Sequence, residues 1–119
     1  MMSEAVQQLN HVYFMLVKTT TIWLQIPTTG RFKFLETTIS PILKQYPSVK
    51  MRFFDSEAFS GRYSDVIMWE TAEVQEYQFL VDKLRETLFW DTYFEVIEIV
   101  PSIENAYAIH HGVAPISGN

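Results

Sequence analysis

The sequence predicts an α+β sandwich, in which two helices cover one face of a four-stranded antiparallel sheet. Two observations predict this fold class. Four apolar, β-prone runs and two amphipathic segments follow one another in the order strand, helix, strand, strand, helix, strand. The length of 119 residues and the hydrophobic content of 48% suit a single domain with one core.

The first half of the chain supplies one strand and one helix. Residues 12–17 (VYFMLV) are unbroken apolar sequence, which predicts a central strand buried on both faces. In the connection 19–27 we expect Ile22, Trp23 and Leu24 to enter the core. A helix is predicted over 28–46, because apolar residues recur there at steps of three and four (Phe32, Leu35, Ile39, Ile42 and Tyr46). Pro41 lies inside this pattern and predicts a kink or break near Thr38.

The second half repeats the plan with an additional strand. Strands are predicted over 49–55, 65–70 and 93–100, with Pro101 closing the last strand. Residues 56–64 form a loop longer than a tight hairpin needs. Thr71 is the expected N-cap of the second helix, whose apolar face is again spaced by three and four (Val74, Tyr77, Val81, Leu84 and Leu88).

Two strand–helix–strand units joined by a short link favour the ferredoxin-like βαββαβ topology, with the strand order 4-1-3-2. Charged residues fall on the two strands that this order places at the edges, where charge is tolerated. They are Lys50 and Arg52 on the second strand, and Glu95 and Glu98 on the fourth.

The interiors of the central strands, 12–17 and 66–69, are apolar at every position, although the helices cover only one face of such a sheet. An antiparallel sheet with one face in water should instead alternate apolar and polar residues. We therefore expect a second copy to cover the other face, giving a homodimer of the dimeric α/β-barrel type. An ion pair between Arg52 of one copy and Glu95 or Glu98 of the other is a further expectation.

Composition excludes several classes of function. A net charge of −5 argues against nucleic-acid binding, and the absence of cysteine excludes disulfides and thiol chemistry. No apolar run reaches the length of a membrane span, so we expect a cytoplasmic protein without membrane contact. The expected organisation is a flexible arm over 1–10, one domain over 11–109 and a flexible tail over 110–119, with 101–109 packed on the body or across the dimer.

Residues 52–71 (RFFDSEAFSGRYSDVIMWET) and 94–108 (FEVIEIVPSIENAYA) resemble the darcynin family of small bacterial proteins. The likeness runs from about residue 10 to residue 109. Its general plan is also similar to that of the dimeric α/β-barrel superfamily. That group holds cofactor-independent monooxygenases, lactone isomerases, haem-binding enzymes and ligand-sensing modules. The resemblance implies the fold, and it transfers no catalytic residue.

Candidate ligand-binding residues come from two groups. Aromatic residues around the second helix could line a slot for a flat apolar molecule, although aromatic residues at such junctions more often belong to the core. Charged residues on the second and third strands and their loop could hold a polar group, or form ordinary edge ion pairs. The candidates are Arg52, Phe54, Trp69, Trp90, Tyr93 and Glu98.

No metal site and no organic cofactor are expected. His11, His110 and His111 are the histidines of the chain, and none lies on a predicted helix or central strand. Two hypotheses remain. The first is a homodimer that binds a small apolar or aromatic molecule between sheet and helices, with or without catalysis. The alternative is a structural or regulatory dimer with a solid interior.

Overall fold

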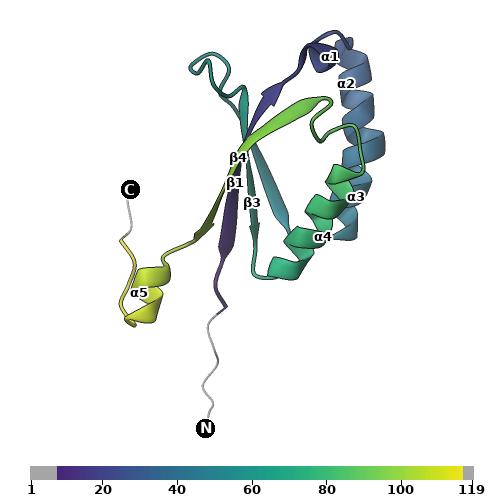
Figure 1. Cartoon of the computed structure of the whole chain (residues 1–119). Coiled ribbons are helices and arrows are strands. Elements are labelled where there is room, and N and C mark those ends of the chain that lie inside the picture. Colours follow the sequence, from purple (N-terminus) through teal and green to yellow (C-terminus); the bar gives the residue numbers. More distant parts are fainter. Residues whose placement is uncertain (1–7, 117–119) are drawn as a thin grey trace.

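The computed structural model describes residues 8–116 and shows the predicted sandwich (Figure 1). The strands are β1 (His11–Thr19), β2 (Lys50–Asp55), β3 (Asp65–Thr71) and β4 (Phe94–Ile103). They form one antiparallel sheet in the order β2-β3-β1-β4, which is the predicted order read from the other edge. The helical elements are α1 (Thr21–Leu24), α2 (Thr28–Phe34), η1 (Leu35–Ile39), α3 (Ser40–Gln45), α4 (Val74–Arg85) and α5 (Ala106–His110).

The strand register divides the side chains between two faces. Tyr13 of β1 lies opposite Trp69 of β3, and Met15 lies opposite Ile67. These residues face the helices and are largely buried, with Met15 fully so. The intervening residues, among them Phe14, which is 36% exposed, belong to the other face, which the described helices leave open.

The core lies between the sheet and the helices. It combines β1 and β3 side chains with the inner face of α4 and with the aromatic residues Trp23, Phe89 and Phe94. Its best-buried side chains are Met15, Val17, Trp69, Leu80 and Leu84. Replacing Leu80 or Leu84 by Ala should therefore cost about 2–5 kcal/mol of stability.

The first predicted helix is interrupted where expected. The α-helical turns of α2 and α3 are separated by a π-helical turn, η1, which ends just before Pro41. Proline has no backbone N–H, so it cannot donate to the carbonyl four residues earlier. A wider turn accommodates this missing bond without ending the helix. The prediction of a disturbance near Thr38 is confirmed.

Three local expectations were wrong. In the first connection Trp23 is buried, but Ile22 and Leu24 are 52% and 55% exposed, because the short α1 turns only one of its three apolar residues inward. Thr71 belongs to β3, and its Oγ1 accepts a hydrogen bond from the Glu73 backbone N–H at 2.9 Å, one residue before α4 begins. Pro101 lies within β4, since an edge strand has a free side that needs no N–H donor.

The C-terminal helix α5 stands away from the sandwich, beyond the end of β4 (Figure 1). Asn10 anchors the chain before it, because its side-chain amide donates to Glu104 Oε1 at 2.9 Å. Of the segment 101–109, residues 101–103 continue β4 and pair with β1, whereas Tyr107 on α5 is 80% exposed, so within one chain the expected packing on the body is wrong for α5. Packing across a dimer stays a prediction.

The expected N-terminal arm and C-terminal tail lie partly outside the described residues, since 1–7 and 117–119 are not described. None of the helices within residues 8–116 has the length and apolar character needed to cross a bilayer.

Candidate functional site

A large cleft lies between β2 and the helical layer of α2, η1 and α3. Its volume is about 750 Å³. The lining is mostly apolar, with two carboxylates, Glu36 and Asp55, and no basic side chain. The apolar lining consists of Phe32, Leu35, Ile39, Leu43, Met51, Phe53 and Phe94.

The cleft leaves large apolar side chains accessible to solvent. Phe32 on α2 is 66% exposed and Phe53 on β2 is 45% exposed, on opposite walls. Removing apolar surface from water is worth about 25 cal/mol per Å². The rings of Phe32 and Phe53 are only partly covered and face one cavity, so burying both rings favours the binding of a molecule that contacts them together.

The inner end of the cleft narrows to a small, entirely apolar extension of about 40 Å³ next to Trp69. Trp69 is only 2% exposed, and its indole Nε1–H has no hydrogen-bond partner among the described residues. A buried donor without a partner costs about 1–3 kcal/mol. Trp69 is therefore a core residue, and its indole N–H is not part of the surface of this extension, which is entirely apolar.

The outer end of the cleft is acidic. Asp55 lines it and lies opposite Asp65 in the β2–β3 register. Carboxylate oxygens of Asp55, Asp65 and Glu57 all lie within 4.8 Å of one another. None of the three forms an ion pair within residues 8–116.

Asp65 is the buried member of this group, at 3% exposure. Burial raises the pKa of its carboxyl from 3.8 to about 6, and the negative charges of Glu57 and Asp55 contribute in the same direction. The Ser64 hydroxyl opposes the shift by donating a hydrogen bond to Asp65 Oδ2 at 2.7 Å. Like charges close together disfavour full ionisation, so this end of the cleft carries unbalanced negative charge.

The π-helical turn η1 forms part of the helical wall. Leu35, Glu36 and Ile39 of this turn line the cleft. A π turn is wider than an α turn and changes the direction of its side chains relative to a regular helix. Such turns are often found at functional sites.

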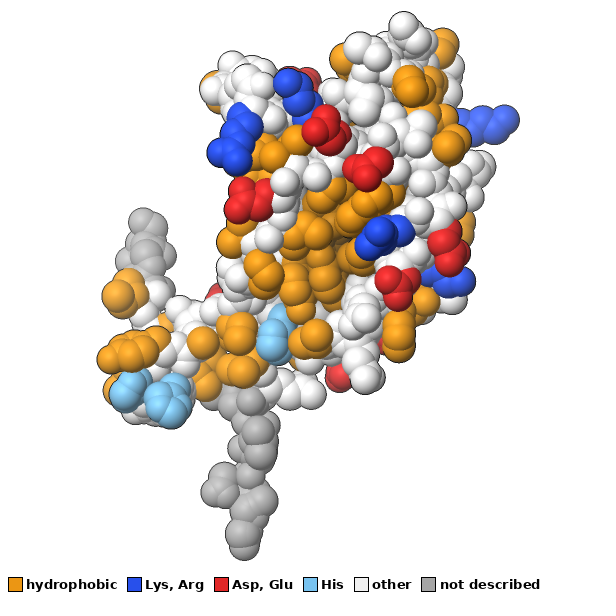
Figure 2. Space-filling view, viewed as in Figure 1, with side chains coloured by type: hydrophobic (Ala, Val, Ile, Leu, Met, Phe, Trp, Pro, Cys, Tyr) orange, Lys and Arg blue, Asp and Glu red, His pale blue; other side chains and the backbone are white. Residues whose placement is uncertain are grey.

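A second, smaller groove of about 340 Å³ lies between β4 and α4. Figure 2 shows hydrophobic side chains gathered between these two elements. Here the rings of Tyr13 and Tyr77 stack in parallel, with centroids 3.7 Å apart. The Tyr77 hydroxyl is buried without a partner in the described part of the chain, and burial, with a smaller contribution from Tyr13, raises its pKa to about 12.

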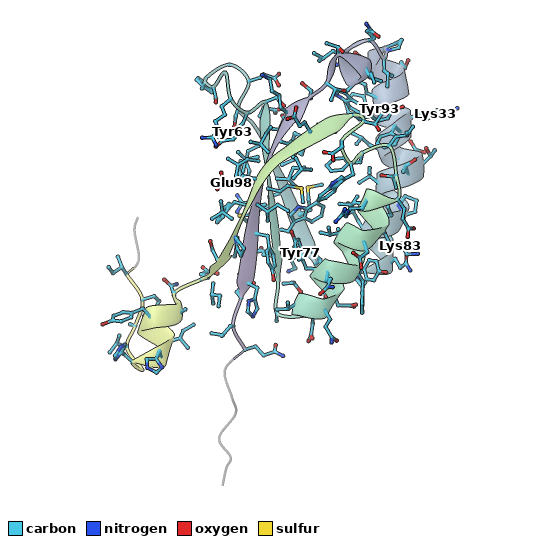
Figure 3. All side chains as sticks on the ribbon, in the orientation of Figure 1. Lys33, Tyr63, Tyr77, Lys83, Tyr93 and Glu98 are labelled. Carbon is cyan, nitrogen blue, oxygen red and sulfur yellow. The ribbon has the colours of Figure 1, made fainter. Side chains whose placement is uncertain are left out.

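The predicted site residues are divided between the two faces of the sheet. Figure 3 shows Tyr93 on the helical side and Glu98 on the open side. Trp69 lines the small apolar extension, and neither Tyr93 nor Trp90 lines the cleft or the extension. The Tyr93 ring packs on the Phe34 ring with centroids 4.8 Å apart, and Arg85 Cζ lies 5.5 Å from the Trp90 ring centroid. The open face holds the remaining candidates, Arg52, Phe54 and Glu98.

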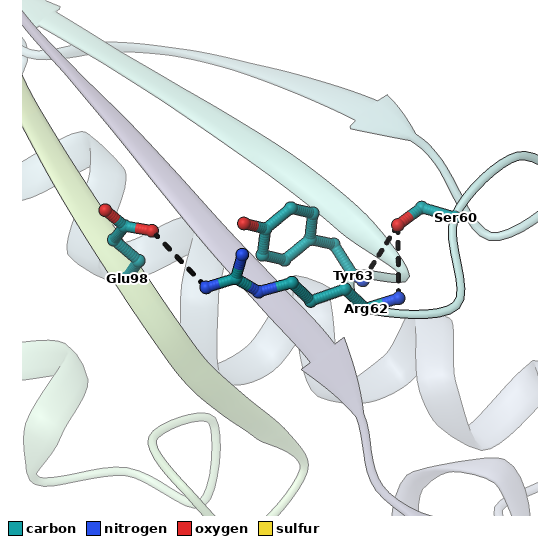
Figure 4. Close-up of polar contacts among 4 residues, drawn as sticks. All are labelled: Ser60, Arg62, Tyr63 and Glu98. Carbon is teal, nitrogen blue, oxygen red and sulfur yellow. Dashed lines mark hydrogen bonds and ion pairs between the residues drawn. The ribbon is translucent and has the colours of Figure 1, made fainter.

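The charged candidates on the open face already have neighbours. The Arg52 guanidinium lies over the Phe54 ring at 5.2 Å. Arg62, on the loop between β2 and β3, places its Nη2 atom 3.9 Å from Glu98 Oε1 (Figure 4). Both members of this pair are exposed, so it is worth about 1 kcal/mol at most.

Sequence reasoning missed most of the cleft's lining. The spacing of Phe32, Leu35 and Ile39 placed them on one helix face, which is correct, but it did not mark them as candidate ligand-binding residues. The alternation of Met51, Phe53 and Asp55 along β2 was a usable signal, because it puts two apolar side chains and a carboxylate on one side of an edge strand.

Residues 5–118 match a family described as darcynin, a domain of unknown function. A darcynin homolog from Granulibacter bethesdensis is 49% identical over 100 residues, which cover 83% of this chain and 81% of that protein. A second homolog, from Streptomyces avermitilis, is 43% identical over 105 residues and covers 87% of each chain.

Solved structures show the same fold at low sequence identity. A haem-binding protein from Thermus thermophilus has a TM-score of 0.72 at 12% identity, covering 90% of this chain and 45% of that chain. A dimeric chlorite dismutase from Nitrobacter winogradskyi has a TM-score of 0.64 at 19% identity, covering 83% and 58%. The chain thus spans about half the length of these structures, and the likeness concerns the fold alone. From the family match and the identities to its relatives, the chain belongs to the darcynin family.

Proposed function

We propose that this protein binds a small, largely apolar molecule in the cleft between β2 and the helices α2, η1 and α3. The observation that carries this proposal is the cavity of about 750 Å³, which lies within the size range of small-molecule sites. Its lining has the usual character of such sites, an apolar surface with a few polar groups. Of the residues predicted from the sequence, we assign Trp69 to the small apolar extension at the inner end of this cleft.

The chemistry of the cleft does not fit haem, the ligand named for the Thermus relative in fold. Haem iron is held by His, Cys, Met or Tyr. The lining offers Met51 as its one candidate of these types, and the haem propionates would meet Glu36 and Asp55 with no base in the lining. We therefore propose no haem binding and no haem chemistry for this chain.

We infer in addition that two copies pair through the open face of the sheet. Phe14, Phe54 and Val100 on or beside this face are 36%, 41% and 39% exposed. A second sheet would cover them, and a stable pairing should bury about 1,600 Å² in total. In that arrangement Arg52 on one edge strand would approach Glu95 or Glu98 on the opposite edge of the partner.

The same cleft allows binding with or without catalysis. Asp55 and Asp65 could move a proton if a bound molecule placed one beside them, so an enzyme without an organic cofactor is one form of the proposal. A structural or regulatory dimer is the alternative. We propose that this function is carried out in the cytoplasm.

A fluorescent neutral probe, N-phenyl-1-naphthylamine, tests the binding proposal. Its emission should rise when it enters the cleft of the wild-type protein. Phe32→Ala should weaken binding severalfold with little loss of stability, because Phe32 is 66% exposed. Phe59→Ala is the matched control, since Phe59 is 91% exposed and lies outside the cleft lining.

Two results would contradict the proposal. One is unchanged probe emission in the presence of the wild-type protein. The other is equal probe affinity in the Phe32→Ala and wild-type proteins. If Phe32→Ala instead changes the monomer–dimer equilibrium, the exposed rings belong to an interface and the structural alternative takes over.

A further inference from the structure

We propose that the ligand of the cleft is an elongated apolar amine, whose protonated nitrogen is held at the acidic end by Asp55 and its neighbouring carboxylates. This inference rests on the proposed binding function and names the chemical class of the ligand.

The first argument is charge complementarity. The lining of the cleft contains Glu36 and Asp55 and no basic residue. Glu57 and Asp65 add two carboxylates within 4.8 Å of each other and of Asp55. Unbalanced negative charge beside an apolar surface attracts cations and disfavours anions.

Nearby basic side chains have other partners. Arg31 donates hydrogen bonds to the carbonyls of Leu24 and Ile26, both at 2.9 Å. Arg62 faces Glu98, and Lys18 donates to the Gly61 carbonyl at 3.3 Å. None of these three side chains forms an ion pair with Asp55, Glu57 or Asp65.

The second argument is the apolar surface that leads to this end. A small metal ion would satisfy carboxylates but would leave Phe32 and Phe53 exposed. An amine with an apolar body would cover both rings while its ammonium group meets Asp55. The surface and the charge belong to one cavity, so one molecule with both properties accounts for both.

The third argument is the character of the opposite end. The extension beside Trp69 has a volume of about 40 Å³ and presents only apolar surface. It would receive the apolar end of the ligand, away from the carboxylates.

The strand register gives the length of the ligand. Asp55 lies opposite Asp65, and Met51 lies opposite Trp69, so the two ends are four residues apart along β3. At about 3.3 Å per residue this is about 13 Å, with Phe53 and Ile67 between the ends. A chain of about ten atoms spans that distance.

Competition with the neutral probe tests the charge preference directly. Decylamine, decanol and decanoate share one apolar chain and differ in the charge of the head group. With the full-length protein at pH 7.5, decylamine should displace the probe at a concentration at least tenfold lower than decanoate, with decanol between them. Asp55→Asn should weaken decylamine about fivefold, as expected for loss of an exposed ion pair, and should change decanol less than twofold. Phe32→Ala should weaken all three ligands alike.

The outcomes separate this inference from the binding function on which it rests. If all three ligands displace the probe equally, or if decanoate is the strongest, the amine assignment is wrong while the cleft remains a binding site. If the probe itself does not bind, the proposed function fails. If magnesium or zinc ions compete with decylamine and Asp55→Asn removes that competition, the carboxylates form a metal site and the amine assignment is overturned.

Discussion

Replacing Asp65 by Asn should change how the stability of the protein depends on pH. Asp65 is 3% exposed, and burial raises its pKa from 3.8 to about 6. The folded protein therefore takes up this proton more readily than the unfolded chain. Protonation on going from pH 7 towards pH 5 stabilises the fold, and this stabilisation is lost as the pH rises through about 6.

The size of the effect follows from the two pKa values. With 3.8 in the unfolded chain and about 6 in the folded protein, Asp65 adds about 1.3 kcal/mol of stability between pH 7 and pH 5. For a chain of 119 residues this corresponds to about 5 °C in melting temperature. An Asn side chain carries no titrating proton there, and its carbonyl oxygen can still accept the Ser64 hydrogen bond.

The assay is urea unfolding at pH 5, 6 and 7, followed by tryptophan fluorescence. The stability of the wild type relative to Asp65→Asn should rise by about 1.3 kcal/mol from pH 7 to pH 5. Asp82→Asn, at an exposed position on α4, is the control for a general effect of removing one negative charge. A difference between wild type and Asp65→Asn that stays constant within about 0.3 kcal/mol would refute the reasoning.

Three further predictions concern the core, the assembly and the C-terminal helix. Trp69→Phe removes packed volume, which destabilises the fold, and also removes an unpaired donor, which stabilises it. Urea unfolding should therefore show a loss of stability below about 2 kcal/mol, and a larger loss would mean that the indole N–H has a partner. Light scattering at micromolar concentration should show a dimer for the wild type and a monomer for Phe14→Glu, and a wild-type monomer would contradict the dimer proposal. Ending the chain after Asn105 should leave the melting temperature within about 2 °C of that of the full-length protein, because α5 stands away from the sheet. A decrease in melting temperature that becomes larger at higher protein concentration would show that α5 packs on a second copy.

The topology was predictable because each element had a strong periodic signal. Residues 12–17 and 65–70 were predicted as central strands from their apolar interiors, and both are central strands in the structure. The charges at Lys50, Arg52, Glu95 and Glu98 marked the edge strands correctly. The break near Thr38 followed from Pro41 alone, because a missing N–H has a predictable local effect.

The cleft was not predictable from the same signals. Apolar spacing shows which residues share a face, and it does not show how far that face lies from the sheet. Phe32 and Ile39 have the same helical pattern, yet Phe32 is 66% exposed at the mouth while Ile39 is 7% exposed. Which sheet face each strand residue occupies also depends on register, so Arg52 and Trp69 could be grouped by sequence although the structure separates them.

The edge proline shows a third limit. Pro101 read as the end of a strand because proline cannot donate to a ladder. The structure continues β4 to Ile103, with Pro101 opposite Tyr13. Whether a strand can continue through a proline depends on the strand order, because the outermost strand has one side without hydrogen-bond partners.

Methyl-labelled NMR of the full-length protein, titrated with N-phenyl-1-naphthylamine, tests the central claim most directly. Binding in the cleft predicts that the methyl signals of Leu35, Ile39, Leu43 and Met51 shift with a single dissociation constant. The methyl signals of Leu16 on the open sheet face should stay in place. Shifts confined to the open face, or no shifts at probe saturation, would contradict a binding cleft between β2 and the helices.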